Sequence, residues 1–180
     1  MNNSQHAALT IFAIYAFLGH SFAALPRHPS RMTSIGSTDS LAEVREKKRA
    51  LLLVFKLGVI DTEDNDRPII EFALKAEPQN RRYGLAYETI ANRLNRYIHK
   101  YKSMTAVTQL SDADFVIFFN LLEYRRILNT TYPYGELFVI VKGTAAQTRP
   151  HLVWKSKKIQ WAGDAVKDLI KDLKSTRGEV

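Results

Sequence analysis

Three polar residues in the second half of the chain could do chemistry together. Asp112 and Asp114 flank Ala113 just before an apolar run, and His151 begins another. Two carboxylates and an imidazole can act as general acid and base if they converge in one cleft. An Asp that precedes a strand is more commonly a turn residue whose side chain bonds nearby backbone. An enzyme built on these three residues is therefore the least favoured hypothesis, and we expect no catalytic set.

Motifs for cofactors and metals are absent from the sequence. The eight glycines occur singly, so there is no phosphate-binding loop, dinucleotide fingerprint or nucleophile elbow. The chain has no cysteine, which excludes a thiolate zinc site, a cysteine nucleophile and a disulfide scaffold. The five histidines never pair at metal-ligand spacing, and the pattern around His99 indicates a solvated side chain. We expect neither a cofactor nor a metal.

A cluster of carboxylates in the first half resembles a calcium loop only superficially. It comprises Asp61, Glu63, Asp64 and Asp66. A calcium loop of that type needs a glycine at its sixth position, a terminal Glu and flanking helices, and these are missing. An acidic hairpin turn is the better interpretation.

Positive charge is more informative than any motif. The chain has 26 Lys and Arg residues against 18 Asp and Glu, a net charge of +8. Residues 81–102 hold six basic residues against Glu88, and residues 137–163 hold five basic residues and no acidic one. Such segments can contact phosphates, anionic lipid or an acidic partner, although a solvated face is the alternative. The predicted contact residues are Arg93, Arg96, Lys100, Lys155, Lys157 and Lys158.

Hydrophobic periodicity predicts the elements that position these residues. Strands are expected at residues 50–60, 69–76, 115–124, 136–142 and 151–161, with a loop at 129–135. Helices are expected at 83–102, with Tyr97 and Tyr101 on the core side, and from about 163 to 175, with Asp164 as N-cap. The order predicts an α+β two-layer sandwich, a mostly antiparallel sheet of about five strands with two main helices packed on one face. Its predicted core includes Phe55, Leu94, Phe115, Ile117, Val139, Trp154 and Leu169.

The N-terminal segment is typical of an export signal. Residues 7–18 are almost wholly apolar, but this run is too short to span a bilayer, which needs about 20 apolar residues. Ser21 and Ala23 have the spacing of a signal-peptidase site, although the first six residues lack Lys and Arg. We expect a signal at 1–23, a flexible leader at 24–40, one domain at 41–176 and a tail at 177–180. A secreted or periplasmic location follows, with membrane anchoring by an uncleaved N-terminal segment as the alternative.

Residues 129–131 form an Asn-Thr-Thr sequon. Asn129 would be a surface glycosylation acceptor in a eukaryotic secretory protein and would have no such role in a bacterium.

Several short motifs resemble a known family. They are DADFVIFF at 112–119, ELFVIVKG at 136–143, HLVWKSKK at 151–158 and a closing helix VKDLIKDLK at 166–174. Their order resembles small exported bacterial domains of unknown function that are similar to the N-terminal domains of the TolB and CsgG envelope proteins. The matching pairs are Ala113-Asp114 and Val153-Trp154, whereas the lipid-modified cysteine is missing. The resemblance implies an accessory or assembly role in the envelope, without catalysis.

These observations favour an exported, non-enzymatic domain that binds a partner through a basic surface. The expected partner is a protein or an anionic component of the cell envelope or of the cell exterior, and no stable membrane span is expected after signal cleavage. The alternative is a nucleic-acid or anionic-polymer binding protein that uses the same basic residues.

Overall fold

A mixed β-sheet organises the protein. The computed structural model describes residues 40–59, 65–77, 83–143 and 149–180, which lie in one compact unit. Six strands run in the order β2-β1-β3-β4-β5, with β6 beside β4. Their bounds are β1 Arg49–Phe55, β2 Thr105–Val107, β3 Phe115–Ile127, β4 Thr130–Val141, β5 His151–Lys155 and β6 Gln160–Trp161. The predicted α+β class is confirmed. The sheet is mixed, because β1 is parallel to both β2 and β3, whereas the β3–β4, β4–β5 and β4–β6 pairings are antiparallel as expected.

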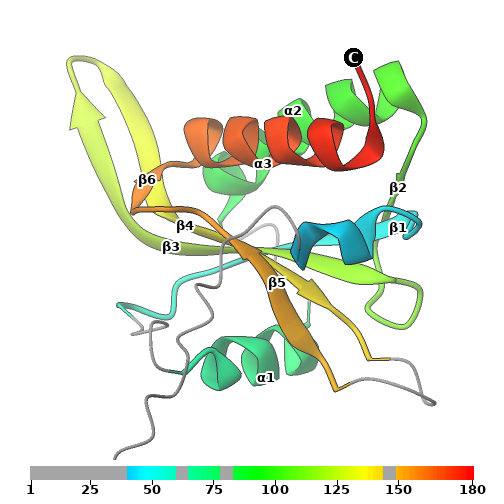
Figure 1. Ribbon diagram of the computed structural model, residues 1–180. Helices are drawn as coiled ribbons and strands as arrows, with labels where there is room; N and C mark the ends of the chain where they lie inside the picture. Colours follow the sequence, from blue (N-terminus) through cyan, green and yellow to red (C-terminus); the bar gives the residue numbers. More distant parts are fainter. Residues whose placement is uncertain (1–39, 60–64, 78–82, 144–148) are drawn as a thin grey trace, which may run out of the picture. The chain divides into compact units, whose positions relative to one another are not determined.

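Helices cover both faces of this sheet (Figure 1). The helices α2 (Gly84–Tyr101) and α3 (Ala162–Arg177) pack on one face, together with the short 3-10 helix η1 (Ser40–Val44). The helix α1 (Arg67–Lys75) packs on the other face. The prediction of two main helices on one face is confirmed, but a third helix on the second face makes the domain three layers deep there.

The segment 69–76 is predicted as a strand, but its residues 69–75 form most of α1. Ile69, Ile70 and Ala73 are buried against the sheet, at the spacing of one helix face. Pro68 stands in the first turn, where its missing N–H is not needed. The apolar run is short enough to fit both the helical and the strand period, and its packing against the sheet selects the helix, whose first turn accepts the proline. Because this segment does not return as an antiparallel strand beside β1, the strands that pair with β1 are reached through helical crossovers, as parallel strands require.

The segment predicted as a loop at 129–135 is strand instead. The strands β3 and β4 pair from Phe115↔Val141 outward to Ile127↔Thr130, which leaves a two-residue turn. The predicted strand at 151–161 is broken into β5 and β6 by an intervening turn. Glycine is required at one point of the long hairpin, because a Cβ at Gly135 would lie 2.0 Å from the backbone oxygen of Asn120.

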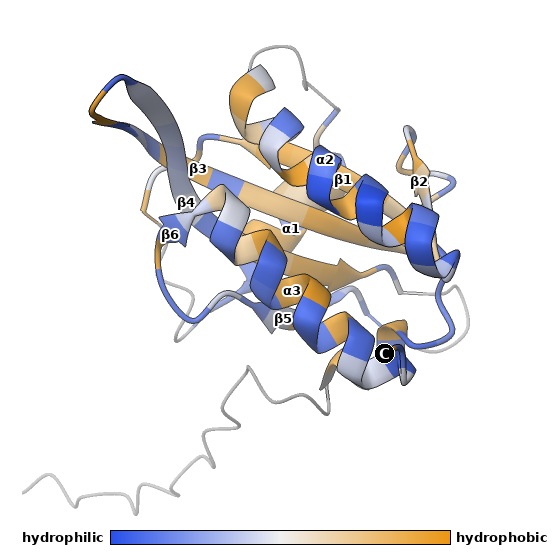
Figure 2. Ribbon diagram, turned by 90° about the horizontal axis from the view of Figure 1, so that it is seen from above, coloured by the Kyte–Doolittle hydropathy of each residue, from blue (hydrophilic) through white to orange (hydrophobic). Residues whose placement is uncertain are grey.

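The two long helices agree with the predicted periodicity. Figure 2 shows the alternation of apolar and polar residues along α2 and α3. Asp164 is not the N-cap of the last helix, because α3 begins two residues earlier and Trp161 occupies that position. Lys102 and Gly178 end α2 and α3 in left-handed conformations, as is usual at a helix C-terminus.

The core residues predicted from the sequence are all buried. The inner strand β3 is buried along residues 115–121, because both of its faces are covered by helices. The predicted signal and leader at residues 1–39, and the acidic residues at 61–64, lie outside the described residues.

Candidate functional site

A positively charged concave surface lies between α2 and α3. A groove of about 290 Å³ opens there. Its described lining residues are five cations and three apolar or aromatic side chains: Arg93, Arg96, Lys100, Lys167, Lys174, Tyr97, Tyr101 and Ile170. We call this surface the basic groove. One exposed face of α2 and one exposed face of α3 therefore form the two sides of a positively charged cleft.

The two helices bring cations together because each one separates its side chains by helical period. On α2, the three predicted contact residues Arg93, Arg96 and Lys100 are three or four positions apart and share one face. On α3, Lys167 and Lys174 face the groove, whereas Asp168 and Asp172 bond Gln160 and Trp154 elsewhere. In the described part of the chain, no ion pair joins a groove cation to a carboxylate.

Aromatic rings hold several of these cations in place. The guanidinium of Arg93 lies 5.5 Å from the ring centroid of Trp161. The ammonium groups of Lys100 and Lys174 lie 4.8 and 5.2 Å from the ring centroid of Tyr101. Hydrogen bonding from these two ammonium groups lowers the pKa of the Tyr101 hydroxyl. The ring of Tyr101 therefore contacts one lysine from each helix at the same end of the groove.

Tyr97 lies at the floor of the groove. It is buried, and its pKa rises to about 12, chiefly because burial disfavours the phenolate and secondarily because of the nearby Glu179 carboxylate. Its ring packs 5.3 Å from that of Tyr101. Neither ring is open for a nucleic-acid base to stack on both sides, as the sequence pattern indicated.

The other three predicted contact residues are not part of the groove lining. Lys155 ends β5 and is half-buried, and its charge opposes the effect of burial on the pKa of Glu136, which burial raises. Lys157 and Lys158 lie exposed in the turn between β5 and β6. The structure thus brings Arg93, Arg96 and Lys100 together and places the second set on a different element.

The three residues of the enzyme hypothesis do not converge. Asp114 precedes β3, and its carboxylate accepts hydrogen bonds from the side chain of Arg49 and from the backbone N–H groups of Lys48 and Arg49. The Arg49 hydrogen bonds lower the pKa of Asp114 to about 2, against an opposing effect of burial. Asp112 is exposed beside it, bonded by Ser111. His151 lies on β5, which β4 separates from β3.

His151 has partners of its own. Its Nε2 lies 3.0 Å from both carboxylate oxygens of Glu43, and its Nδ1 lies 2.9 Å from the carbonyl oxygen of Arg149. Both ring nitrogens face acceptors, so only the doubly protonated imidazolium satisfies both. Burial lowers the pKa of His151, but these bonds outweigh that effect and the net direction is upward. The residue fastens η1 to the start of β5.

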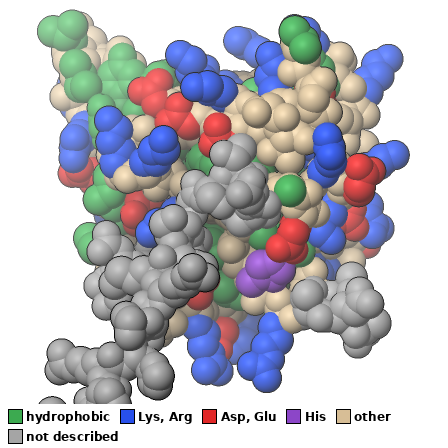
Figure 3. Space-filling view, in the orientation of Figure 1, with side chains coloured by type: hydrophobic (Ala, Val, Ile, Leu, Met, Phe, Trp, Pro, Cys, Tyr) green, Lys and Arg blue, Asp and Glu red, His purple; other side chains and the backbone are tan. Residues whose placement is uncertain are grey.

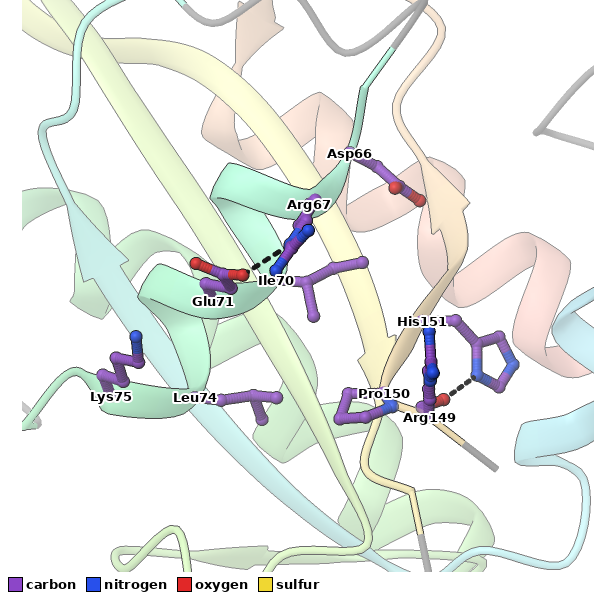
Figure 4. A pocket seen from close by; sticks show the side chains of 9 residues that line it. All are labelled: Asp66, Arg67, Ile70, Glu71, Leu74, Lys75, Arg149, Pro150 and His151. Atoms are coloured by element: carbon purple, nitrogen blue, oxygen red, sulfur yellow. Dashed lines mark hydrogen bonds and ion pairs between the residues drawn. The ribbon is translucent and has the colours of Figure 1, made fainter. Parts of the chain in front are cut away.

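A second pocket lies beside this contact (Figure 4). It has a volume of about 630 Å³ and lies between α1 and the segment 149–151. Its charges are mixed, since Arg67 and Glu71 pair with each other on α1 and Asp66 lies near His151. Its lining contains no arrangement of nucleophile, base and oxyanion donors among the described residues.

Sequence reasoning missed Lys167 and Lys174 as functional candidates. The last helix has alternating Lys and Asp residues, so its net charge is small and does not indicate a basic surface. Sorting its charges by helical angle would have shown lysines on one stripe and aspartates on the next. Only the packing of α3 beside α2 places that lysine stripe against Arg96 and Lys100.

Among the described residues, no group of three His, Asp or Glu side chains could hold a metal ion. None of the described helices is long and apolar enough to cross a bilayer. No protein-family model, curated protein or solved structure matches the chain.

Proposed function

We propose that this protein is an exported, non-enzymatic binding domain whose basic groove holds an acidic segment of a partner in the cell envelope or outside the cell. The observation that carries the proposal is the groove itself, in which five cations from two helices line one cleft with no acidic residue among its described lining. The signal-like residues 7–18 and the resemblance to envelope domains support export.

The clustering of like charge is unfavourable for folding alone. Like charges three or four residues apart on a helix destabilise it by about 0.2–0.5 kcal/mol per pair. Both Arg93 with Arg96 and Arg96 with Lys100 have this spacing, and the lysines of α3 face them. A bound anion adds attractive interactions that offset this repulsion, so the arrangement is favourable in a complex.

The shape of the groove favours carboxylates or other small anionic groups on a flexible chain. It is open along its length, and arginines can bind carboxylates in bidentate fashion while lysines act as point charges. The aromatic rings are covered or flanked by cations, which offers nucleic-acid bases no stacking platform. An acidic polypeptide therefore fits better than a nucleic acid.

The proposal is tested by binding to soluble polyglutamate in parallel with a single-stranded oligonucleotide. The groove variant carries Arg96→Gln, Lys100→Gln and Lys174→Gln. The matched control carries Lys48→Gln, Lys56→Gln and Lys75→Gln, which remove the same charge from exposed positions outside the groove. We expect the groove variant to lose polyglutamate affinity about tenfold or more, because three charge-assisted contacts are lost.

The control separates a site from general charge attraction. Equal losses in the groove and control variants would mean that net charge alone attracts the polymer, and the proposal would fail. Tighter binding of the oligonucleotide than of polyglutamate at equal ionic strength would favour the nucleic-acid alternative. For the wild type, log K should fall with log salt, with a shallower slope for the groove variant.

A further inference from the structure

The hairpin formed by β3 and β4 extends well beyond the sheet and ends in exposed apolar side chains. Figure 1 shows it projecting past the other strands, and Figure 3 shows hydrophobic side chains at that projecting end. Leu128 is 92% exposed and Ile127 is 50% exposed. A soluble hairpin has no folding reason to place two large aliphatic side chains side by side at its tip.

The backbone conformation of Leu128 makes an exposed leucine at the tip of the hairpin more unusual. Leu128 has a φ of 55°, whereas Asn129, the other residue of the turn, has no positive φ. A two-residue hairpin turn with a positive φ at its first position is the type that favours glycine there. Leucine is strained in this conformation and gains nothing from burial, so the fold alone would select against it.

The residues behind the tip are arranged in layers. Arg125 and Arg126 come directly behind Ile127, and residues 124–135 contain no acidic side chain. Arg125 is held by Glu123 and stacks 4.3 Å from the ring centroid of Tyr134, while Arg126 is exposed. Tyr124, about 45% exposed, follows next. At about 3.3 Å per residue, the arginines lie about 7–10 Å behind Leu128 at the tip, and the tyrosine lies about 13 Å behind it.

This order matches the depth profile of a membrane interface. Aliphatic side chains enter about 5–10 Å into the boundary between headgroups and acyl chains, arginines reach phosphates at headgroup level, and aromatic residues lie at the interface. A convex tip also suits a lipid surface better than a protein, because a protein partner must supply a matching pocket whereas lipids rearrange around an inserted side chain.

The hairpin and the basic groove lie on the same side of the sheet. Figure 1 shows the hairpin bending toward the side that carries α2 and α3. Trp161 connects the two, because its ring contacts Tyr132 of the hairpin at 5.5 Å and Arg93 of the groove at 5.5 Å. The groove cations therefore add to the positive potential on the side of the sheet toward which the hairpin bends.

We infer that Ile127 and Leu128 insert into the headgroup region of an anionic lipid bilayer, with the exposed Arg126 on a lipid phosphate. This inference goes beyond the proposed function, because it concerns a second surface and names a lipid partner. The hairpin anchors the domain on the membrane, and the groove remains the site for an acidic chain.

The test uses co-sedimentation of the full chain with vesicles of equimolar phosphatidylglycerol and phosphatidylcholine, and with vesicles of phosphatidylcholine alone. The hairpin variant is Ile127→Thr with Leu128→Gly, which keeps a β-branched residue in the strand and gives the turn its preferred residue. The control is Val59→Thr, because Val59 is 84% exposed outside the hairpin. Partitioning onto anionic vesicles should fall at least tenfold in the hairpin variant and stay unchanged in the control.

The polyglutamate assay distinguishes failure of this inference from failure of the proposed function. The hairpin variant should bind polyglutamate as the wild type does. Wild-type binding to polyglutamate without binding to anionic vesicles would overturn the inference and leave the proposed function standing. Vesicle binding that survives in the hairpin variant would show attraction without insertion, which also overturns it. Loss of vesicle binding in that variant, with polyglutamate binding absent throughout, would support insertion and refute the proposed function.

Discussion

Arg177, near the end of the last helix, should be one of the most important polar residues for stability. Its guanidinium donates to three backbone carbonyls: Ser103 at 2.7 Å, Val44 at 2.9 Å and Lys47 at 2.7 Å. These carbonyls belong to the end of η1, the approach to β1 and the loop before β2. One side chain therefore fastens three segments that the sheet alone does not hold.

The expected loss follows from the number and kind of these bonds. Hydrogen bonds to a charged group contribute about 1.5–3 kcal/mol each, so three of them set an upper bound of about 9 kcal/mol. The site is only partly buried, and water can rebind the freed carbonyls. We therefore expect Arg177→Met to lower the free energy of unfolding by about 2–4 kcal/mol. A domain of this size has about 5–15 kcal/mol of stability in total. The variant should therefore lose a large fraction of its stability while keeping its fold.

Urea denaturation followed by far-UV circular dichroism measures this difference. The stability of Arg177→Lys should lie between that of the wild type and that of Arg177→Met, because an ammonium group lacks the forked geometry with which a guanidinium reaches all three carbonyls. The control is Lys171→Met on the same helix, an exposed position that we expect to change stability by less than about 0.5 kcal/mol. If Arg177→Met shifts the urea midpoint no more than Lys171→Met, the clamp contributes nothing and the reasoning is wrong.

Three further predictions concern pH and packing. Asp114, with a pKa of about 2, stabilises the fold above its unfolded pKa, and this contribution is lost as pH falls toward 2; Asp114→Asn should flatten the acid limb of stability against pH. The raised pKa of His151 has the opposite sign, so its contribution is present at low pH and is lost as pH rises through the folded pKa. NMR titration should show that pKa falling in Glu43→Gln, and an unchanged pKa would exclude the contact. Gly135→Ala should cost more than about 3 kcal/mol in a thermal melt, because a Cβ there would meet the Asn120 backbone oxygen at 2.0 Å.

The long amphipathic helices were predictable because each carries many turns of one period. Over the 18 residues of α2, apolar positions such as Ile90 and Leu94 repeat often enough to exclude a strand. The nine residues of α1 offer two turns, and Ile70, Phe72 and Leu74 also alternate as a strand would. In so short a segment, tertiary packing decides between the two periods.

The paths of the strands were harder to predict for a different reason. Tyr132 and Pro133 follow a turn signal and look like a loop, yet they pair with Arg125 and Tyr124 of the neighbouring strand. Their pairing depends on the length of that partner strand, which local sequence does not contain. Parallel pairing of β1 likewise depends on where α1 and α2 carry the chain.

The basic surface shows why charge counted along the chain differs from charge presented in space. Residues 137–163 have five cations and no acid, yet Lys142 is used internally, where its ammonium group bonds the carbonyl of Leu110. By contrast, the balanced last helix supplies Lys167 and Lys174 to the groove because its aspartates face elsewhere. A helix divides charges by angle, and packing then selects one stripe. The useful sequence quantity for a binding surface is thus the charge of each helical stripe, and segment totals apply only where the chain has no periodic structure.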